Sequence, residues 1–390
     1  MLPTAPLPRP RGSHRPPPRR PRRRLLVTAV IALILSPIAG SYTDALVAPG
    51  SATFAVRSVE WLRDHHAGPL VDLVENWVYA HNQASSGGPD PALLLLFGGA
   101  VAAGGLHPDP LPQPDLPLPG ESQWVPSPRT VGPAHPLYTA YFRPDPATPS
   151  LVVGAAWMNQ SLIRAHLIAG LLDPPHPGSG VPVDAAGGQV PPGLRPDLLA
   201  TFNSGFKLKD AHGGYATGGR EVVPLVDGAA TAAIDTTGRI TIGQWGRDLG
   251  PRPGLAAIRQ NLALVVDAGA PVPGLGDNTT EAWGTARNQL QYTWRSGLGL
   301  DRHGNLIYVA ADHLSLAELA TAMSAAGVVR GMQLDIHPQT VGFLSYGPGT
   351  AAQATPHGSH LLPGMRPLDT RYLQPDQRDF FAITAATTQP

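Results

Sequence analysis

The sequence predicts an α+β protein: a sheet-rich mixed domain with few helices, preceded by an N-terminal membrane segment. Short apolar runs separated by glycine-containing turns recur through the second half of the chain, as strands and hairpins require. Glycine and proline supply 44 and 45 of the 390 residues, which disfavours long helical bundles. Eight arginines followed at once by an apolar run open the chain, which is typical of a membrane-inserted segment.

Residues 1–24 hold those eight arginines and no acidic residue, so we predict a basic, Arg/Pro-rich cytoplasmic tail. Arginines before the apolar run 25–35 predict insertion with the N-terminus in the cytoplasm. We favour a signal anchor over 25–47, because no clean small-x-small cleavage site follows the run. A cleaved signal peptide is the alternative, and a buried helix in a cytoplasmic protein is a third. Both membrane alternatives place the body outside the cytoplasm, either single-pass in the cell membrane or secreted.

The rest of the chain is mildly acidic. Its 366 residues carry 20 basic and 28 acidic side chains, a net charge of −8. We therefore expect no nucleic acid partner, because binding phosphates requires clustered positive charge. The absence of cysteine excludes disulfides, thiolate metal sites and cysteine nucleophiles.

Composition divides the remaining chain into three parts. We predict a juxtamembrane helical region over 48–107, because apolar residues recur there at three- and four-residue steps between 52 and 82. A second apolar run, 92–105, is short for a bilayer span. Prolines at every second or third position predict an extended linker over 108–119, and the globular domain should cover 120–390.

Within that domain, local signals predict mainly strands. One helix is expected over 315–326, because Ser315 and Glu318 form a capping box and Gly327 follows as a stop. The expected strands and hairpin arms are residues 151–153, 162–167, 198–202, 231–235, 239–242, 262–266, 292–300, 305–310 and 331–335.

Polar groups with backbone freedom gather at three places. The first is the turn Asn203-Ser204-Gly205-Phe206-Lys207 after an apolar strand, where ligands can approach a sheet end. The second is Arg295, flanked by Trp294 and Ser296, with Arg259 before a buried strand as a similar case. Ordinary turns and paired surface arginines are the alternative interpretation of both.

The third place is Asp335-Ile336-His337, where a strand that follows the capped helix ends. On a continuing strand, Asp335 and His337 would face the same side. We expect no cofactor. A divalent metal held with Asp267 or Asp312 is an open alternative, although no spacing fixes a third ligand. The motifs of serine hydrolases, phosphate-loop nucleotide hydrolases and zinc proteases are absent from the sequence.

Taken in order, these pieces resemble the phosphodiester glycosidase domain family. The resemblance covers roughly 195–345 and includes Asn203-Ser204-Gly205-Phe206, which is similar to the family's Asn-Gly-Gly-Phe. It also includes Arg295-Ser296-Gly297-Leu298-Gly299, the following hairpin and helix, and Leu334-Asp335. One departure concerns the next residues: the family continues into Gly-Gly-Gly-Ser, whereas this chain has Ile336-His337-Pro338-Gln339-Thr340.

The resemblance implies an extracytoplasmic, membrane-anchored hydrolase that cleaves sugar-1-phosphodiester linkages in envelope glycans. Under it, Asp335 serves as nucleophile or base, Arg295 and Arg259 hold the phosphate, and His337 assists proton transfer. The implied substrate-binding residues are Asn203, Gly205, Phe206 and Arg259. A non-catalytic glycan-binding or wall-assembly module on the same fold is the alternative, and a plain tethered structural protein is a third.

Overall fold

The structure is a computed structural model, which describes residues 21–48, 53–89, 106–174, 187–285, 291–348, 353 and 357–386. Most of the predicted basic tail and the second apolar run, 92–105, lie outside the described residues. Internal contacts divide the chain into two compact units, residues 1–48 and residues 49–390.

The first unit contains one long helix over the predicted membrane segment. This helix, α1, runs from Pro21 to Val47 and includes Pro37. Several of its apolar side chains are exposed, Val30, Leu33 and Ile38 among them. Among the residues that the structure describes, no helix combines the length and apolar character needed to cross a bilayer.

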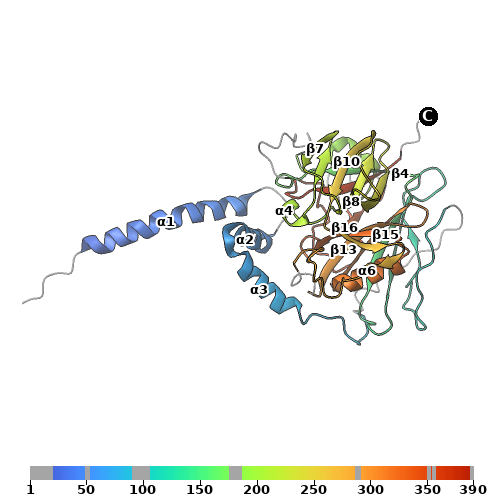
Figure 1. The fold of residues 1–390 in the computed structure, drawn as a ribbon, viewed down its shortest axis with the longest axis horizontal. Coiled ribbons are helices and arrows are strands. Elements are labelled where there is room, and N and C mark those ends of the chain that lie inside the picture. The colour runs from blue at the N-terminus through green and yellow to red at the C-terminus, as the bar shows by residue number, and fades with distance from the viewer. Residues whose placement is uncertain are drawn as a thin grey trace, which may run out of the picture. The chain divides into compact units, whose positions relative to one another are not determined.

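The second unit is built on three sheets, in which all the described strand pairs are antiparallel (Figure 1). The eight-stranded sheet contains, in spatial order, β1 (Val125–Pro126), β2 (Leu137–Phe142), β3 (Val153–Met158), β14 (Leu306–Leu314), β13 (Thr293–Leu300), β15 (Arg330–Ile336), β11 (Leu264–Asp267) and β12 (Ala270–Pro271). One five-stranded sheet contains β7 (Arg220–Val223), β6 (Tyr215–Thr217), β10 (Leu255–Gln260), β8 (Ala230–Asp235) and β9 (Ile240–Gln244). The other contains β17 (Ser359–His360), β16 (Phe343–Ser345), β5 (Leu198–Asn203), β18 (Phe380–Ala385) and β4 (Ile163–Ile168).

Helices are few and short in this unit. We call residues 54–79 the helical hairpin; it consists of α2 (Phe54–Leu62), the kinked turn η1 (Arg63–Ala67) and α3 (Gly68–Tyr79). The other helices among the described residues are η3 (Pro192–Asp197), α4 (Leu208–Ala211) and α6 (Leu316–Ala325). The predicted sheet-rich α+β class is therefore confirmed.

The best-signalled elements lie where the sequence predicts them. Helix α6 begins at a complete capping box, in which Ser315 accepts from the Glu318 amide and Glu318 accepts from the Ser315 amide. The two predicted hairpins form as β8–β9 and β13–β14. Strand β3 starts only at Val153, so the predicted strand over 151–153 is shifted toward the C-terminus.

The core has two main layers. One lies between the sheets, and the other lies between the large sheet and α6, which packs beside β13 and β15 (Figure 1). Glycine permits this second contact, because a Cβ at Gly297 would lie 2.3 Å from Sδ of Met323. The proline-rich segment 108–119 forms no helix or strand, yet Leu111 is buried in the α6 layer.

Candidate functional site

The site lies where the ends of strands from all three sheets meet. Strand β15 ends just after Asp335, β5 ends at Asn203, and β10 ends at Gln260. The pair Arg378-Asp379 lies directly before β18. Strand ends therefore bring together polar groups that are distant in the sequence.

The carboxyl group of Asp335 is the centre of the site. One oxygen accepts from the amide of Ile336 at 2.8 Å, and the other lies 3.3 Å from Nη2 of Arg378. Burial raises the pKa of Asp335, and the guanidinium of Arg378 opposes that rise. A carboxyl group with a raised pKa is a stronger base once it is ionised, so Asp335 has the electrostatics of a proton acceptor.

Arg378 joins Asp335 to a second carboxylate. Its Nη2 also donates to the carbonyl of Gly205 at 2.9 Å, and its Nε lies 3.5 Å from Asp173. Burial, followed by the charge of Asp379, raises the pKa of Asp173. The guanidinium therefore lies between two carboxyl groups whose charged forms it stabilises.

Arg259 is more deeply buried than Arg378 and donates to the backbone of the turn that follows β5. Its side chain is fully buried, with Nε 2.7 Å from Asp379 and Nη1 donating to the carbonyl of Gln260 at 2.6 Å. A further donation goes to the carbonyl of Phe206. Arg259 thus holds the backbone at Gln260 and Phe206 in place beside the site.

The predicted turn after β5 is held by side-chain amides. Asn203 is buried; its Nδ2 donates to Oγ of Ser296 at 2.9 Å, and its Oδ1 accepts from Tyr308 at 3.1 Å. Gly205 has φ +155°, and a Cβ there would lie 3.0 Å from the Asn261 side chain. The amide of Phe206 donates to Asn261 at 3.1 Å. Gly205 and Phe206 therefore lie at the site, whereas the side chain of Asn203 is buried against β13 and β14 and does not line the cavity.

Arg295 lies apart from the group around Arg378. It is fully buried, and its guanidinium donates to the carbonyls of Leu314 and Gln291 and to Oε1 of Gln333, at 2.8, 3.0 and 3.1 Å. Its guanidinium is therefore hydrogen-bonded inside the protein and is not positioned to contact a phosphate as we expected. Arg378 occupies the position beside Asp335 that we expected Arg295 to take.

His337 begins the loop that replaces the family's glycine-rich sequence. Its φ of +79° ends the strand, so the alternation expected to place it beside Asp335 stops at Ile336. The ring lies 3.6 Å from Glu75, 3.5 Å from the Thr293 hydroxyl and 5.5 Å from the Tyr79 ring. Burial and two nearby arginines lower the pKa of His337 to about 3, so the ring is neutral at neutral pH.

A cavity of about 350 Å³ opens at Asp335 and His337. This volume lies within the range of small-molecule sites. The cationic side chains lining it are Arg63, Lys207, Lys209 and Arg378. The lining also includes five acidic side chains, so acids and cations are nearly balanced in number: Glu60, Asp72, Asp210, Glu281 and Asp335.

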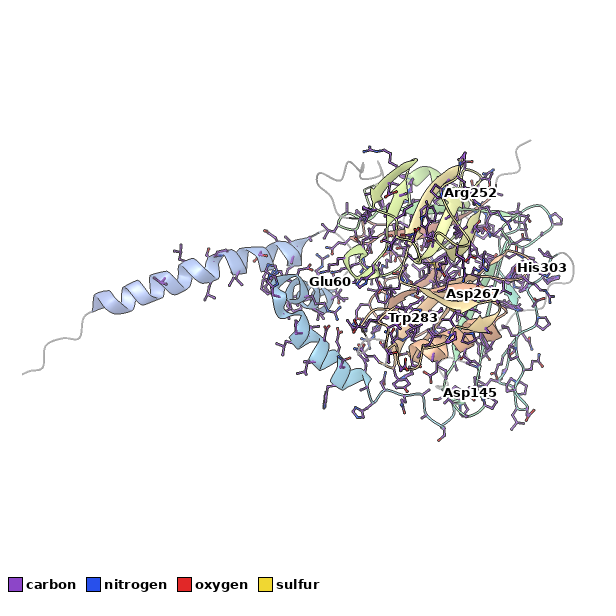
Figure 2. All side chains as sticks on the ribbon, viewed as in Figure 1. Glu60, Asp145, Arg252, Asp267, Trp283 and His303 are labelled. Atoms are coloured by element: carbon purple, nitrogen blue, oxygen red, sulfur yellow. The ribbon has the colours of Figure 1, made fainter. Side chains whose placement is uncertain are left out.

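The helical hairpin forms one wall of this cavity. Glu60 of α2, labelled in Figure 2, lies 3.4 Å from Lys207, and Asp64 lies 2.8 Å from Lys209. Farther along, Oδ1 of Asn76 accepts from Gln291 at 2.6 Å. Acidic groups of the hairpin thus pair with lysines that line the cavity.

Within the described residues, no three histidine or acidic side chains approach closely enough to hold a metal ion. The two carboxylates considered for such a site are engaged elsewhere. Asp267 pairs with Arg247 and Arg330 at 2.7 and 3.1 Å, and Asp312 lies 3.8 Å from His313.

Arg378, Asp379 and Asp173 are not among the site residues that the sequence predicts. One signal was available for the first two, because Arg378-Asp379 directly precedes the wholly apolar start of a strand at Phe380. Charged residues at that position are brought to a sheet end, as the residues after β5 and β15 are. Asp173 lies in a loop and carried no comparable signal.

No protein-family model matches the chain, and no curated protein sequence matches it. Several solved structures are distantly similar, among them the three that follow. A zebrafish structure described as the N-acetylglucosamine-1-phosphodiester alpha-N-acetylglucosaminidase catalytic domain auto-inhibited by its pro-peptide shares 12% identity at a TM-score of 0.38. That match covers 66% of this chain and 86% of the zebrafish chain.

The other two are a hypothetical protein from Synechocystis, with 15% identity and a TM-score of 0.32, and a putative exported protein from Burkholderia pseudomallei K96243, with 12% identity and a TM-score of 0.31. Each match covers 60% of this chain, with 59% of the Synechocystis chain and 74% of the Burkholderia chain. These similarities amount to a distant structural relationship.

Proposed function

We propose that this chain is a glycosidase-like hydrolase that cleaves sugar-1-phosphodiester linkages in envelope glycans. The observation that carries the proposal is the pairing of Asp335 with Arg378 at a cavity whose lining includes Lys207 and Lys209. A carboxylate near the anomeric carbon and cations at the phosphate are the two requirements of this reaction, because positive charge develops at the anomeric carbon while negative charge stays on the leaving phosphate.

The chemistry needs few groups. When the bond between the anomeric carbon and the phosphate oxygen breaks, the electron pair stays on the phosphate, which leaves as a stable anion without a proton. Asp335 acts as nucleophile at the anomeric carbon or as base toward the attacking water. Arg378 and the lysines hold the phosphate, and the backbone at Gly205 orients sugar hydroxyls.

Hydrolysis of a methyl N-acetylglucosamine-1-phosphodiester by the full chain and by Asp335→Asn tests the proposal. We expect the variant to lose about 10²–10⁴-fold in kcat, the usual contribution of a positioned acid or base. Asp267→Asn is the matched control, since Asp267 lies at the end of β11 and is labelled away from Glu60 in Figure 2. Full hydrolysis by Asp335→Asn would contradict the role assigned to Asp335. Saturable binding of the sugar phosphodiester by the wild-type chain without turnover would instead identify a glycan-binding module.

The proposed location is the outer side of the cytoplasmic membrane, with residues 25–47 as a single-pass anchor. The support is the order of eight arginines and an apolar run at the start of the chain. Fusion of alkaline phosphatase, which is active only outside the cytoplasm, to the C-terminus tests it. An active fusion is expected, and an inactive one made in normal amounts would refute the location.

A further inference from the structure

Helix α3 is amphipathic, but its apolar face is exposed to solvent and its polar face is turned toward the rest of the domain. Its apolar side chains recur at three- and four-residue steps and face solvent: Leu70, Leu73, Val74, Trp77 and Val78 are 62, 59, 53, 77 and 49% exposed. A surface helix of a globular protein normally turns such a stripe toward the core. Trp77 is a large aromatic side chain with three quarters of its surface in water, which a free surface rarely retains.

The polar face of α3 is directed inward by specific contacts. Glu75 pairs with Arg63 and lies 3.6 Å from His337, and Asp72 lies 3.5 Å from Arg63. The side chain of Asn76 accepts from Gln291 at 2.6 Å. Rotating α3 to bury its apolar stripe would break these contacts, so the outward direction of the stripe is built into the hairpin.

The neighbouring sequence indicates what covers this stripe. Only six residues separate α2 from α1, and α1 contains the apolar run that follows eight arginines. An apolar run of this kind holds the adjoining hairpin close to a bilayer surface. Tryptophan is enriched at that interface because its ring is apolar and its N–H is polar.

A second copy of the chain fits this face less well. Stable protein interfaces bury about 1,200–2,000 Å² in total. Helix α3 has 12 residues and is therefore about 18 Å long, so a single stripe on it offers a small part of that area. A bilayer has no such minimum, since it accepts one helix lying flat.

We propose that the apolar face of α3 lies in the interfacial layer of a lipid bilayer, with Trp77 at the level of the headgroups. The bilayer contact and the catalytic cavity then use opposite faces of one hairpin. This inference does not depend on the proposed hydrolase activity.

The absence of cysteine allows a direct test on the full chain. An environment-sensitive fluorophore is attached at Val74→Cys on the stripe, or at Arg252→Cys, an exposed control site labelled far from the hairpin in Figure 2. Both proteins are mixed with phosphatidylcholine–phosphatidylglycerol vesicles. Because the N-terminal segment is present in both, any general tethering affects the two labels equally.

We expect a blue shift of the Val74→Cys label and its quenching by lipid-borne spin labels, with neither effect at Arg252→Cys. The shift should be lost when Leu73 and Trp77 are replaced by serine, exposed positions at which folding is not at risk. Equal, unshifted emission from both labels with vesicles would overturn the proposal. A blue shift at Val74→Cys without vesicles that grows with protein concentration would overturn it too, because a second copy would then cover the stripe.

Discussion

At the scale of single residues, Arg378 is the main charge that opposes the effect of burial on the pKa of Asp335. Burial favours the neutral carboxyl group, whereas Arg378 favours the carboxylate. Replacing Arg378 with glutamine should raise the pKa of Asp335 by about one unit or more, the usual effect of losing an adjacent opposite charge. The acid limb of the pH profile of kcat/KM should move to higher pH by the same amount.

Arg330→Gln is the control for that shift. Arg330 also pairs with carboxylates, Asp248 and Asp267, but none of these lines the cavity. An acid limb that stays in place in Arg378→Gln would show that the activity does not follow the ionisation of Asp335.

The buried ring of His337 makes folding stability depend on pH. Its pKa is about 3 in the folded chain and about 6.5 when unfolded, so only the unfolded chain takes up the proton between these values. Stability from this group is complete above pH 6.5 and is lost as the pH falls, by about 1.4 kcal/mol per unit. In His337→Asn, which tolerates the left-handed backbone, that loss should be absent.

Urea unfolding of both proteins between pH 7 and 5 measures this difference. Glu75, Arg63 and Arg295 face the ring and remain in both proteins, as do the other histidines. Parallel stability curves for the wild type and His337→Asn would contradict a neutral, buried His337.

The contrast between Arg295 and Arg378 shows what residue patterns could predict. The sequence indicates Arg295 through its neighbours Trp294 and Ser296, but it does not indicate which side of β13 the arginine side chain takes. A register irregularity between Arg295 and Gly297 separates it from the regular alternation. Arg378 lies 43 positions after Asp335 and reaches it only through packing of β18 beside β5. The spacing of residues along the chain therefore could not predict that contact.

At the scale of elements, acidic side chains of the helical hairpin compete with an anionic substrate for the lysines that line the cavity. Glu60 and Asp64 pair with Lys207 and Lys209, which an anionic substrate would need. Each partly exposed pair contributes about 0.2–1 kcal/mol. Replacing both acids by their amides, Glu60→Gln with Asp64→Asn, removes about 0.4–2 kcal/mol in total and should therefore raise kcat/KM roughly two- to thirtyfold.

Hydrogen exchange gives an independent measurement of the hairpin. Protection of amides in 54–79 should decrease in the double variant and remain unchanged in the control Asp115→Asn, an exposed acid outside the hairpin. If kcat/KM fell while protection decreased, the hairpin acids would be contributing to substrate binding rather than opposing it.

Elements differ in how far the sequence determines them. Helix α6 and the β13–β14 hairpin carry their own start and turn residues, so local signals suffice. The two helices of the helical hairpin also have periodic apolar residues. Their orientation, however, depends on ion pairs with distant lysines and on a hydrogen bond from Gln291. Periodicity identifies an apolar face without saying whether protein covers it.

At the scale of the whole molecule, one buried ion pair connects two sheets beneath the site. Arg259 is at the end of β10, and Asp379 directly precedes β18 in another sheet. Both side chains are fully buried, at a separation of 2.7 Å. Removing one partner of such a pair leaves an uncompensated charge and typically costs about 3–5 kcal/mol.

Asp379→Asn should therefore lower the melting temperature by about 5 °C or more, given the unfolding entropy of a unit of this size. Since residues 49–390 form one compact unit, the shift should affect a single calorimetric transition. Asp197→Asn, which removes a half-exposed partner of Arg129, is the matched control and should shift the transition little. A separate low-temperature transition in Asp379→Asn would show instead that the sheets unfold independently, and the site at their junction would then open before the rest of the domain.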